Sequence, residues 1–203
     1  TIDNGGCHVE YGTGRKGNYL PKKTRDGRPL QPGNIPGLMP GPEETYQSYG
    51  YGWAIASNTP YRMFKQFDHE GGIRTPMIAH WPTGISDRGT LVRSVSHLID
   101  VMPTVLEACQ LKAPARIDGK PVISSDGHSL AAAFQGKKVP DHEMLFFHHN
   151  KGKALRQGNW KLVSAGGGEW ELYNLKNDPL ELDDLADEEP DQLQKLIAAW
   201  KAE

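Results

Sequence analysis

Two adjacent residues near the start of the sequence, Asp3 and Asn4, have side chains that could bind a metal ion. Gly5 and Gly6 follow them. Neighbouring oxygen-bearing side chains can face one hard cation where a strand ends and the backbone bends, and a glycine pair permits such a bend. Asn-Gly is also a strong signal for a hairpin turn. The segment by itself therefore leaves two interpretations open, a calcium-type site and a plain turn.

A lysine, Lys65, lies in an aromatic and largely uncharged stretch that ends at Phe67. If its ammonium points into a cleft, it is a compact charge suited to binding a tetrahedral oxyanion. The alternative is an amphipathic lysine that lays its methylene stem on apolar surface and keeps its head in water. Both interpretations fit the local sequence.

Three elements are predicted to carry these residues. Residues 60–67 follow Thr59, which predicts a short helix with Thr59 as its N-cap. Residues 75–81 form a short apolar run that predicts a strand. Residues 100–110 predict a second helix with Asp100 as its cap and one apolar face. A strand, a loop and a helix in this order favour an α/β layer arrangement.

The chain changes character after residue 142. Four short strand-like runs separated by turn residues predict an antiparallel meander over 144–148, 154–156, 160–163 and 170–173. Apolar residues then recur at helical spacing up to Trp200, which predicts an amphipathic C-terminal helix. We therefore divide the chain into an α/β part, residues 1–142, and a small antiparallel sheet with a C-terminal helix, residues 143–203.

A long segment, residues 12–43, is rich in glycine, proline and basic residues and has almost no apolar periodicity. It predicts a surface loop. Its cations would favour an anionic ligand nearby, but a solvated excursion of the chain is the simpler explanation of the composition.

Composition excludes several classes of protein. The 203 residues carry a formal charge of −2, so a strongly basic nucleic-acid binder is excluded. The longest apolar stretches are short and interrupted, so no membrane-spanning helix is expected. Two cysteines, Cys7 and Cys109, do not indicate a disulfide framework and leave the compartment undetermined.

Several of these segments, taken in order, resemble the C-terminal half of bacterial arylsulfatases. The resemblance covers nearly the whole chain, and its ordered combination of motifs is highly specific. The segments that carry it are Asp3 to Gly6, residues 50–54, 59–65, 70–76, 100–106, 154–162 and 170–175, and the run from Asp178-Pro179 to Ala186.

The resemblance implies a type I sulfatase of the alkaline-phosphatase superfamily, which hydrolyses aryl or carbohydrate sulfate esters with a formylglycine made from Cys or Ser in a C-x-P/A-x-R signature. It implies that Asp3 and Asn4 are two calcium ligands. Lys65 would be the catalytic cation that binds the sulfate group and eases departure of the ester oxygen. The implied fold is the C-terminal part of an alkaline-phosphatase-like α/β sandwich, followed by the small antiparallel sheet and the C-terminal helix. A periplasmic or secreted location is suggested by the resemblance alone.

The chain also departs from the family pattern. Neither Cys7 nor Cys109 lies in the formylglycine signature, and the family's N-terminal metal ligands are absent. We therefore expect a fragment that carries part of the calcium and sulfate site, has no turnover by itself and binds calcium weakly. Uncovered sheet edges and apolar faces would favour self-association of such a fragment.

Two other functions compete with this interpretation. A phosphoester or phosphonate hydrolase of the same superfamily often has histidine after the metal-binding aspartate, because its transition metals favour imidazole. Asn4 at that position fits calcium better. The second alternative is a non-catalytic module whose basic loop, residues 12–43, binds sulfated polysaccharide.

Overall fold

The computed structural model describes residues 4–12 and 20–202 and divides the chain into two compact units. The first comprises Thr1–Met77, Phe147–Leu155 and Asn159–Glu203, and the second comprises Ile78–Phe146 and Arg156–Gly158. The domain boundary expected between residues 142 and 143 stays a prediction. Within the described residues, no helix is long and apolar enough to cross a bilayer.

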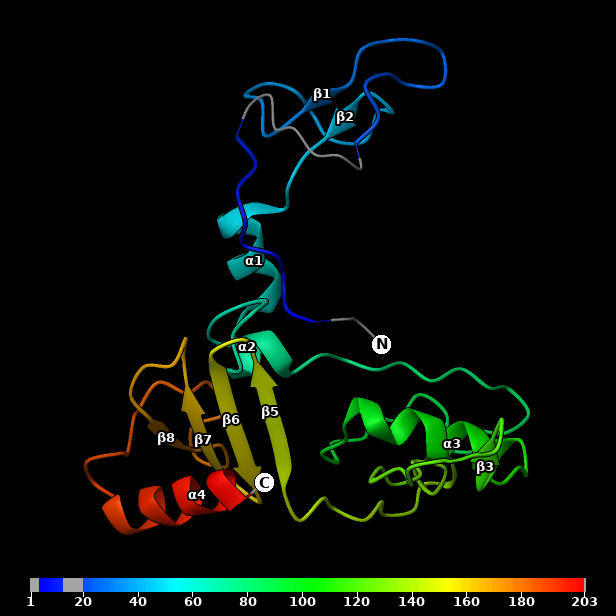
Figure 1. The fold of residues 1–203 in the computed structure, drawn as a ribbon, viewed down its shortest axis with the longest axis vertical. Helices are drawn as coiled ribbons and strands as arrows, with labels where there is room; N and C mark the ends of the chain where they lie inside the picture. The colour runs from blue at the N-terminus through cyan, green and yellow to red at the C-terminus, as the bar shows by residue number, and fades with distance from the viewer. Residues whose placement is uncertain (1–3, 13–19, 203) are drawn as a thin grey trace. The chain divides into compact units, whose positions relative to one another are not determined.

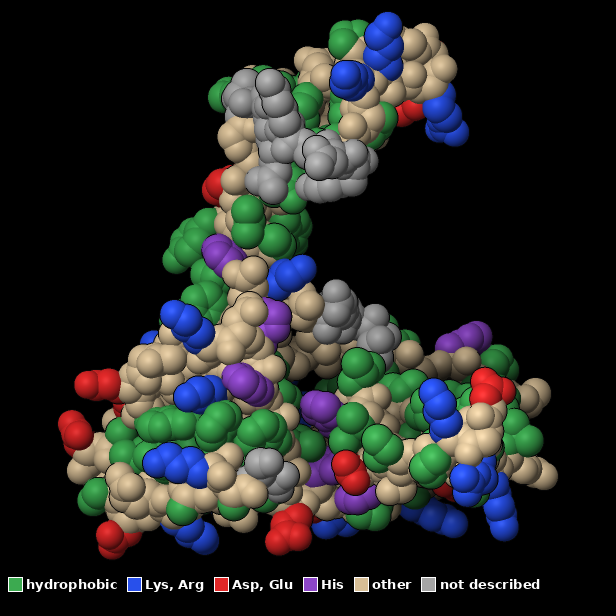
Figure 2. Space-filling view, viewed as in Figure 1, with side chains coloured by type: hydrophobic (Ala, Val, Ile, Leu, Met, Phe, Trp, Pro, Cys, Tyr) green, Lys and Arg blue, Asp and Glu red, His purple; other side chains and the backbone are tan. Residues whose placement is uncertain are grey.

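The N-terminal part of the first unit contains a parallel strand pair, β1 (Gln31–Pro32) and β2 (Thr45–Tyr46), and two helices, α1 (Gly50–Asn58) and α2 (Glu70–Ile73) (Figure 1). Figure 2 shows lysine and arginine side chains on the surface around β1 and β2. Ion pairs neutralise part of that charge. They join Arg25 to Glu43, and Arg28 to both Asp26 and Glu44.

The helix predicted over residues 60–67 is wrong. Thr59 follows the last residue of α1, and its backbone N–H donates to the Ile55 carbonyl, so it closes a helix instead of opening one. The chain cannot continue helically beyond it, because Met63 and Gln66 have φ of 65° and 84°. Helix α1 itself was missed by the sequence analysis, since its first turn contains Gly50 and Gly52.

The strand predicted over residues 75–81 is also wrong, because the segment forms neither helix nor strand. Among the described residues, none donates to or accepts from the backbone of residues 75–80. An apolar run without a neighbouring strand has no ladder to join. Ile78 in this run is 87% exposed.

The second unit is built around a buried carboxylate. It contains η1 (Leu98–Asp100), α3 (Val101–Ala108), the antiparallel pair β3 (Arg116–Ile117) and β4 (Lys120–Pro121), and η2 (Ala133–Gln135). Helix α3 confirms the helix predicted over residues 100–110. Asp100 precedes α3 as predicted, but its side chain accepts from the backbone N–H groups of His97 and His128 and contacts His142 Nε2 at 2.9 Å. The side chain therefore fastens three segments together.

The C-terminal meander is confirmed. Strands β5 (Leu145–His149), β6 (Gly152–Gln157), β7 (Trp160–Ser164) and β8 (Glu171–Asn174) form one sheet in that order, and β7 and β8 pair antiparallel. Helix α4 (Pro190–Ala202) is the predicted C-terminal helix. Its Leu196 is fully buried, and the sheet core contains Ala154, Val163 and Tyr173.

Candidate functional site

Lys65 lies on a tight loop between α1 and α2. Met63 and Gln66 on either side of it have left-handed backbone conformations, which are uncommon for residues other than glycine and cluster at functional sites. The side chain of Lys65 is half-buried. Its ammonium forms no hydrogen bond or ion pair with any residue that the structure describes. The loop thus holds a cation whose charge has no protein partner in the described part of the chain.

The segment that follows Asn4 lies directly against this loop. The Lys65 N–H donates to the Gly6 carbonyl at 3.2 Å, and the Gly5 N–H donates to the Gly72 carbonyl at 3.3 Å. The Gly6 N–H donates to Asn58 Oδ1 at 3.0 Å. Gly5 and Gly6, which follow Asn4, are therefore adjacent to the Lys65 loop and to α2 through their backbones.

Three glycines make this close approach possible. A Cβ atom on Gly5 would lie 2.1 Å from the Gly71 carbonyl oxygen, and one on Gly72 would lie 1.9 Å from the Phe67 carbonyl oxygen. A Cβ on Gly71 would lie 2.2 Å from the Met63 carbonyl oxygen. All three neighbours are backbone atoms, which cannot move aside as a flexible side chain could. The glycines are needed to let segments touch, and not only to let the chain bend.

The donor set only partly fits the expected calcium ion. Asp3 lies outside the described residues. The Asn4 side chain makes no hydrogen bond to a described residue, so its amide oxygen is available as a ligand. No group of three or more His, Cys, Asp or Glu side chains in the described ranges could hold a metal ion. Calcium takes six to eight oxygen ligands. Asp3 and Asn4 could therefore form one edge of such a site, and their role as ligands stays a prediction.

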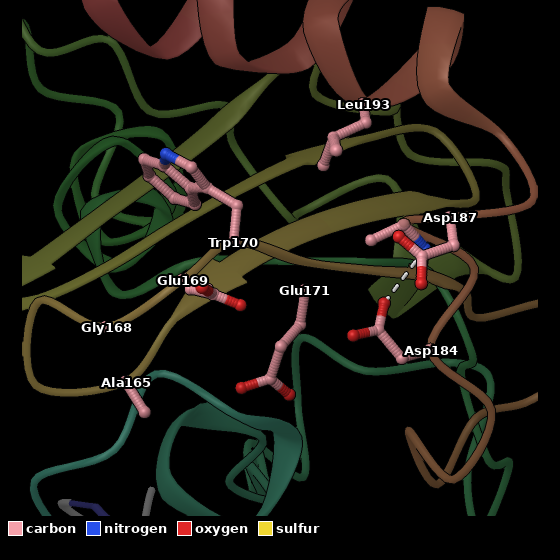
Figure 3. A pocket seen from close by; sticks show the side chains of 9 residues that line it. Ala165, Gly168, Glu169, Trp170, Glu171, Asp184, Asp187 and Leu193 are labelled. Carbon is pink, nitrogen blue, oxygen red and sulfur yellow. Dashed lines mark hydrogen bonds between the residues drawn. The ribbon is translucent and has the colours of Figure 1, made fainter.

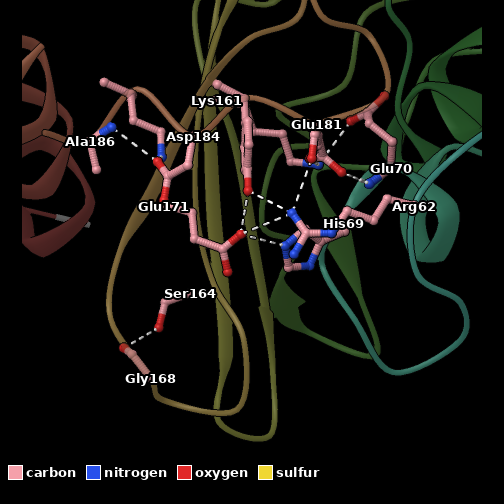
Figure 4. A network of polar contacts seen from close by, with 12 residues as sticks. Arg62, His69, Glu70, Lys161, Ser164, Gly168, Glu171, Glu181, Asp184 and Ala186 are labelled. Carbon is pink, nitrogen blue, oxygen red and sulfur yellow. Dashed lines mark hydrogen bonds and ion pairs between the residues drawn. The ribbon is translucent and has the colours of Figure 1, made fainter. Parts of the chain in front are cut away.

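A buried ion cluster that was not predicted from the sequence includes Glu70, the first residue of α2 (Figure 4). Lys161 Nζ lies 2.9 Å from Glu70 Oε1 and 2.7 Å from Glu181 Oε1. The exposed fractions of the three side chains are 0%, 3% and 0%. The Glu70 N–H also donates to Glu181 Oε2 at 2.7 Å. One lysine thus joins the start of α2 to the segment that follows β8.

A second group of polar side chains extends this cluster. Arg62 Nη1 donates to the Tyr173 hydroxyl at 2.7 Å and to the Glu181 carbonyl at 3.0 Å. Glu171 accepts from Tyr173 and contacts His69 Nε2 at 3.1 Å. Its hydrogen bond with His69, supported by Tyr173 and the Arg62 charge, lowers the pKa of Glu171 to about 2. Burial and the Glu171 carboxylate raise the pKa of Tyr173.

A separate cavity of about 590 Å³ lies beside β8 (Figure 3). Its walls include four carboxylates, those of Glu169, Glu171, Asp184 and Asp187. Asp184 accepts from the backbone N–H groups of Leu172 and Ala186. Carboxylates at this density repel an anion, so the cavity does not suit a sulfate group. The ammonium of Lys65, which has no partner among residues 4–12 and 20–202, is the better candidate for anion binding.

Comparison with known proteins identifies the family. Residues 61–202 match the family model of N-sulphoglucosamine sulphohydrolase, C-terminal. The chain belongs to the sulfatase family. It is 35% identical over 159 residues to an uncharacterized sulfatase of Schizosaccharomyces pombe, covering 75% of this chain and 28% of that protein. It is 36% identical over 105 residues to human arylsulfatase D, covering 51% of this chain and 16% of that protein.

A bacterial relative extends the range of named activities. The N-acetylglucosamine-6-O-sulfatase of Bacteroides thetaiotaomicron is 28% identical over 131 residues, covering 60% of this chain and 23% of that protein. The chain spans less than a third of the length of each of these three relatives. The matched region includes Lys65 and every residue of the buried ion cluster.

Solved structures support the same fold. A structure concerned with the metabolism of multiple glycosaminoglycans by Bacteroides thetaiotaomicron matches with a TM-score of 0.59 and 20% identity, covering 77% of this chain and 35% of that one. The structure of Ps i-CgsB matches with a TM-score of 0.55 and 22% identity, covering 71% of this chain and 32% of that one. The fold is therefore that of sulfatases, with mixed helices and sheets that include a small antiparallel sheet and a C-terminal helix.

Proposed function

We propose that the complete polypeptide carrying this chain hydrolyses sulfate esters, and that Lys65 binds the sulfate group during the reaction. The observation that supports this most strongly is a half-buried ammonium without a described protein partner, held on a strained loop in a chain of the sulfatase family. A positive charge left unpaired in such a place is suited to an anionic ligand.

Lys65 would act on the bond that breaks, which joins sulfur to the ester oxygen. Negative charge develops on that oxygen as it leaves, and an ammonium nearby stabilises the charge more in the transition state than in the ground state. Asp3 and Asn4 would hold calcium, which when bound would offset charge on the sulfuryl oxygens. The formylglycine that attacks sulfur is expected from a part of the polypeptide other than this chain, which by itself would be inactive.

Sulfated carbohydrates are the substrate class we propose. One relative carries the name N-acetylglucosamine-6-O-sulfatase, and Ps i-CgsB has been solved in complex with k-i-k-neocarrahexaose. The cations around β1 and β2 could bind additional anionic groups of such a chain. We keep calcium dependence and self-association of the isolated 203 residues as further parts of this proposal.

The test compares Lys65→Ala with wild type in the complete gene product. The matched control is Lys195→Ala, which removes an exposed lysine of α4. We expect Lys65→Ala to lower kcat/KM for an aryl sulfate by about 10² to 10³-fold, the loss typical of removing one group that stabilises a developing anion. The control should retain wild-type activity. Wild-type kinetics in Lys65→Ala would contradict the role of Lys65.

The phosphoester alternative is tested with matched aryl sulfate and aryl phosphate substrates. An all-oxygen ligand pair favours calcium, so we expect sulfate to be the preferred substrate and a calcium chelator to abolish turnover. A preference for phosphate, or full activity with the chelator present, would contradict this part of the proposal. The isolated chain should show no turnover with either substrate.

A further inference from the structure

We propose that the buried cluster of Lys161, Glu70 and Glu181 positions the loop that presents Lys65, with Lys161 as the positioning residue. The proposal rests on the function proposed above. Its starting point is that the three charges come from three separate sequence motifs and meet in one buried contact (Figure 4). Lys161 is 91 residues from Glu70, and Glu181 is 111 residues from it.

The cluster reaches the C-terminal end of the Lys65 loop through α2. Glu70 is the first residue of that helix, and it is fixed by Lys161 through its side chain and by Glu181 through its backbone N–H. The next two residues are Gly71 and Gly72, which lie in contact with carbonyl groups of residues 62–67. A shift of Glu70 would therefore move the glycine pair against which the loop packs.

The same sheet holds the other end of the loop. Arg62 donates to the Tyr173 hydroxyl in β8 and to the backbone carbonyl of Glu181. Gly71 N–H also donates to the Arg62 carbonyl at 2.8 Å, which joins the two ends to each other. The residues between Arg62 and Glu70 are thus fixed at both ends by contacts with β7, β8 and the segment that follows β8.

Stability alone does not explain this arrangement. Removing charges from water is costly, and well-packed apolar residues of similar volume often stabilise a protein at least as well as a buried ion pair. We infer that the ion cluster instead specifies geometry, because each charged group must meet its partner at one place. The loop requires such specification, since left-handed conformations at Met63 and Gln66 persist only where the surroundings hold them.

A double-mutant cycle in the complete gene product tests the proposal. It combines Lys161→Met with Lys65→Ala and measures kcat/KM for aryl sulfates, well below the melting temperature of each variant. We expect Lys161→Met alone to reduce kcat/KM by about 10 to 10²-fold, because small displacements of a catalytic group have effects of this size. In the Lys65→Ala background the same substitution should have less than about a twofold effect, because the group that it positions is gone.

A series of phenol leaving groups adds a signature that lost stability cannot produce. Both single variants should depend more steeply on leaving-group pKa than wild type, since both weaken stabilisation of the departing oxygen. A smaller fraction of folded enzyme would lower all rates equally. The matched control is Lys153→Met on β6, whose ammonium lies over the Trp200 ring and contacts no carboxylate of a residue that the structure describes. It should leave both rate and slope unchanged.

Lys161→Met leaves two buried carboxylates without their lysine, so a milder variant is included. Tyr173→Phe keeps the buried ring and removes the hydroxyl bound to Arg62. If Lys161→Met does not fold, the same cycle is run with Tyr173→Phe, for which we expect about a 3 to 10-fold loss that again vanishes in the Lys65→Ala background. Equal losses in both backgrounds, with either variant, would overturn the proposal.

Hydrogen exchange separates this inference from the proposed function. The Lys65 N–H is bonded to the Gly6 carbonyl, so its exchange reports how well the loop is held. In Lys161→Met, or in Tyr173→Phe if Lys161→Met does not fold, we expect it to exchange at least about tenfold faster, while amides of the β7 and β8 pairing keep their protection. Unchanged exchange at Lys65 would refute the positioning role. If the wild-type protein does not hydrolyse sulfate esters, the proposed function is refuted. The exchange of the Lys65 N–H would then still test whether the cluster holds the loop.

Discussion

Replacement of Glu171 by glutamine should remove a pH-dependent part of the stability. Glu171 accepts from Tyr173, contacts His69 Nε2 at 3.1 Å and lies 3.4 Å from Arg62 Nη1. The hydrogen bond with His69 is the largest cause of a pKa lowered from 4.5 to about 2. A carboxylate with a lowered folded pKa stabilises the native state above its unfolded pKa, and it loses that contribution as pH falls through the folded value.

The size of the effect follows from the pKa difference. At about 1.36 kcal/mol per pKa unit, lowering from 4.5 to about 2 corresponds to about 3 kcal/mol. The Glu171 side chain is 23% exposed, so solvent screening reduces this to about 2 kcal/mol. We expect the free energy of unfolding of wild type to exceed that of Glu171→Gln by about 2 kcal/mol at pH 6. Near pH 2 the difference should be less than about 0.5 kcal/mol.

Urea unfolding followed by tryptophan fluorescence at several pH values and constant ionic strength measures this difference. Glutamine keeps the shape of the side chain. A loss of unfolding free energy that does not vary with pH therefore reports lost hydrogen bonds, and a loss that varies with pH reports the missing charge. Glu169→Gln is the control, because Glu169 is exposed and precedes Glu171 by two positions. The free energy of unfolding of Glu169→Gln should lie within about 0.5 kcal/mol of the wild-type value at every pH. A stability difference that stays constant between pH 6 and pH 2 would refute the reasoning.

Two further substitutions test the packing of the loop and of the second unit. Gly72→Ala should lower stability and disturb the Lys65 loop, because its Cβ would overlap the Phe67 carbonyl. Gly52→Ala, with open space around the new Cβ, should be neutral or stabilising by up to about 1 kcal/mol. Thermal melts of the two variants measure the difference. An equal effect of the two alanines would contradict the contact argument. Asp100→Asn should cost about 2 to 4 kcal/mol in denaturant unfolding, because a buried carboxylate that bonds three segments is lost. A cost below about 1 kcal/mol would show that these bonds contribute little.

Elements with their own periodicity were predictable, and elements defined by a partner were not. The meander over 144–173 and the helix ending near Trp200 were correct because each has an alternating or helical pattern and turn residues at its ends. The run 75–81 has the composition of a strand but has no described neighbour to pair with. Residues 60–67 have the start signal of a helix, yet Met63 and Gln66 are left-handed, and the segment lies against the glycine pair and against Gly6.

The candidate site shows the same division. Lys65 and Asn4 could be selected by resemblance, and the backbone contact between their segments agrees with that selection. The partners of Lys161 could not be found from spacing, since no local rule links charges 91 residues apart. The sequence does contain one weak signal for this cluster. Lys161 lies inside a predicted strand of a small sheet, where a buried lysine is costly unless a carboxylate pairs with it.

The role proposed for Lys65 requires that its ammonium be held in place without being neutralised. A carboxylate close to Lys65 would fix the side chain but compete with sulfate for its charge, so orientation has to come through the backbone. The contacts of the described residues fit this requirement. Carboxylates contact Lys161, Arg62 and His69, whereas none of the described carboxylates contacts Lys65, whose own N–H is bonded and whose neighbours pack on glycine. A carboxylate introduced beside Lys65 by Gln66→Glu should therefore raise KM for an aryl sulfate about tenfold. The control Gln66→Leu should leave KM unchanged. Equal KM values for the two variants would contradict this division of roles.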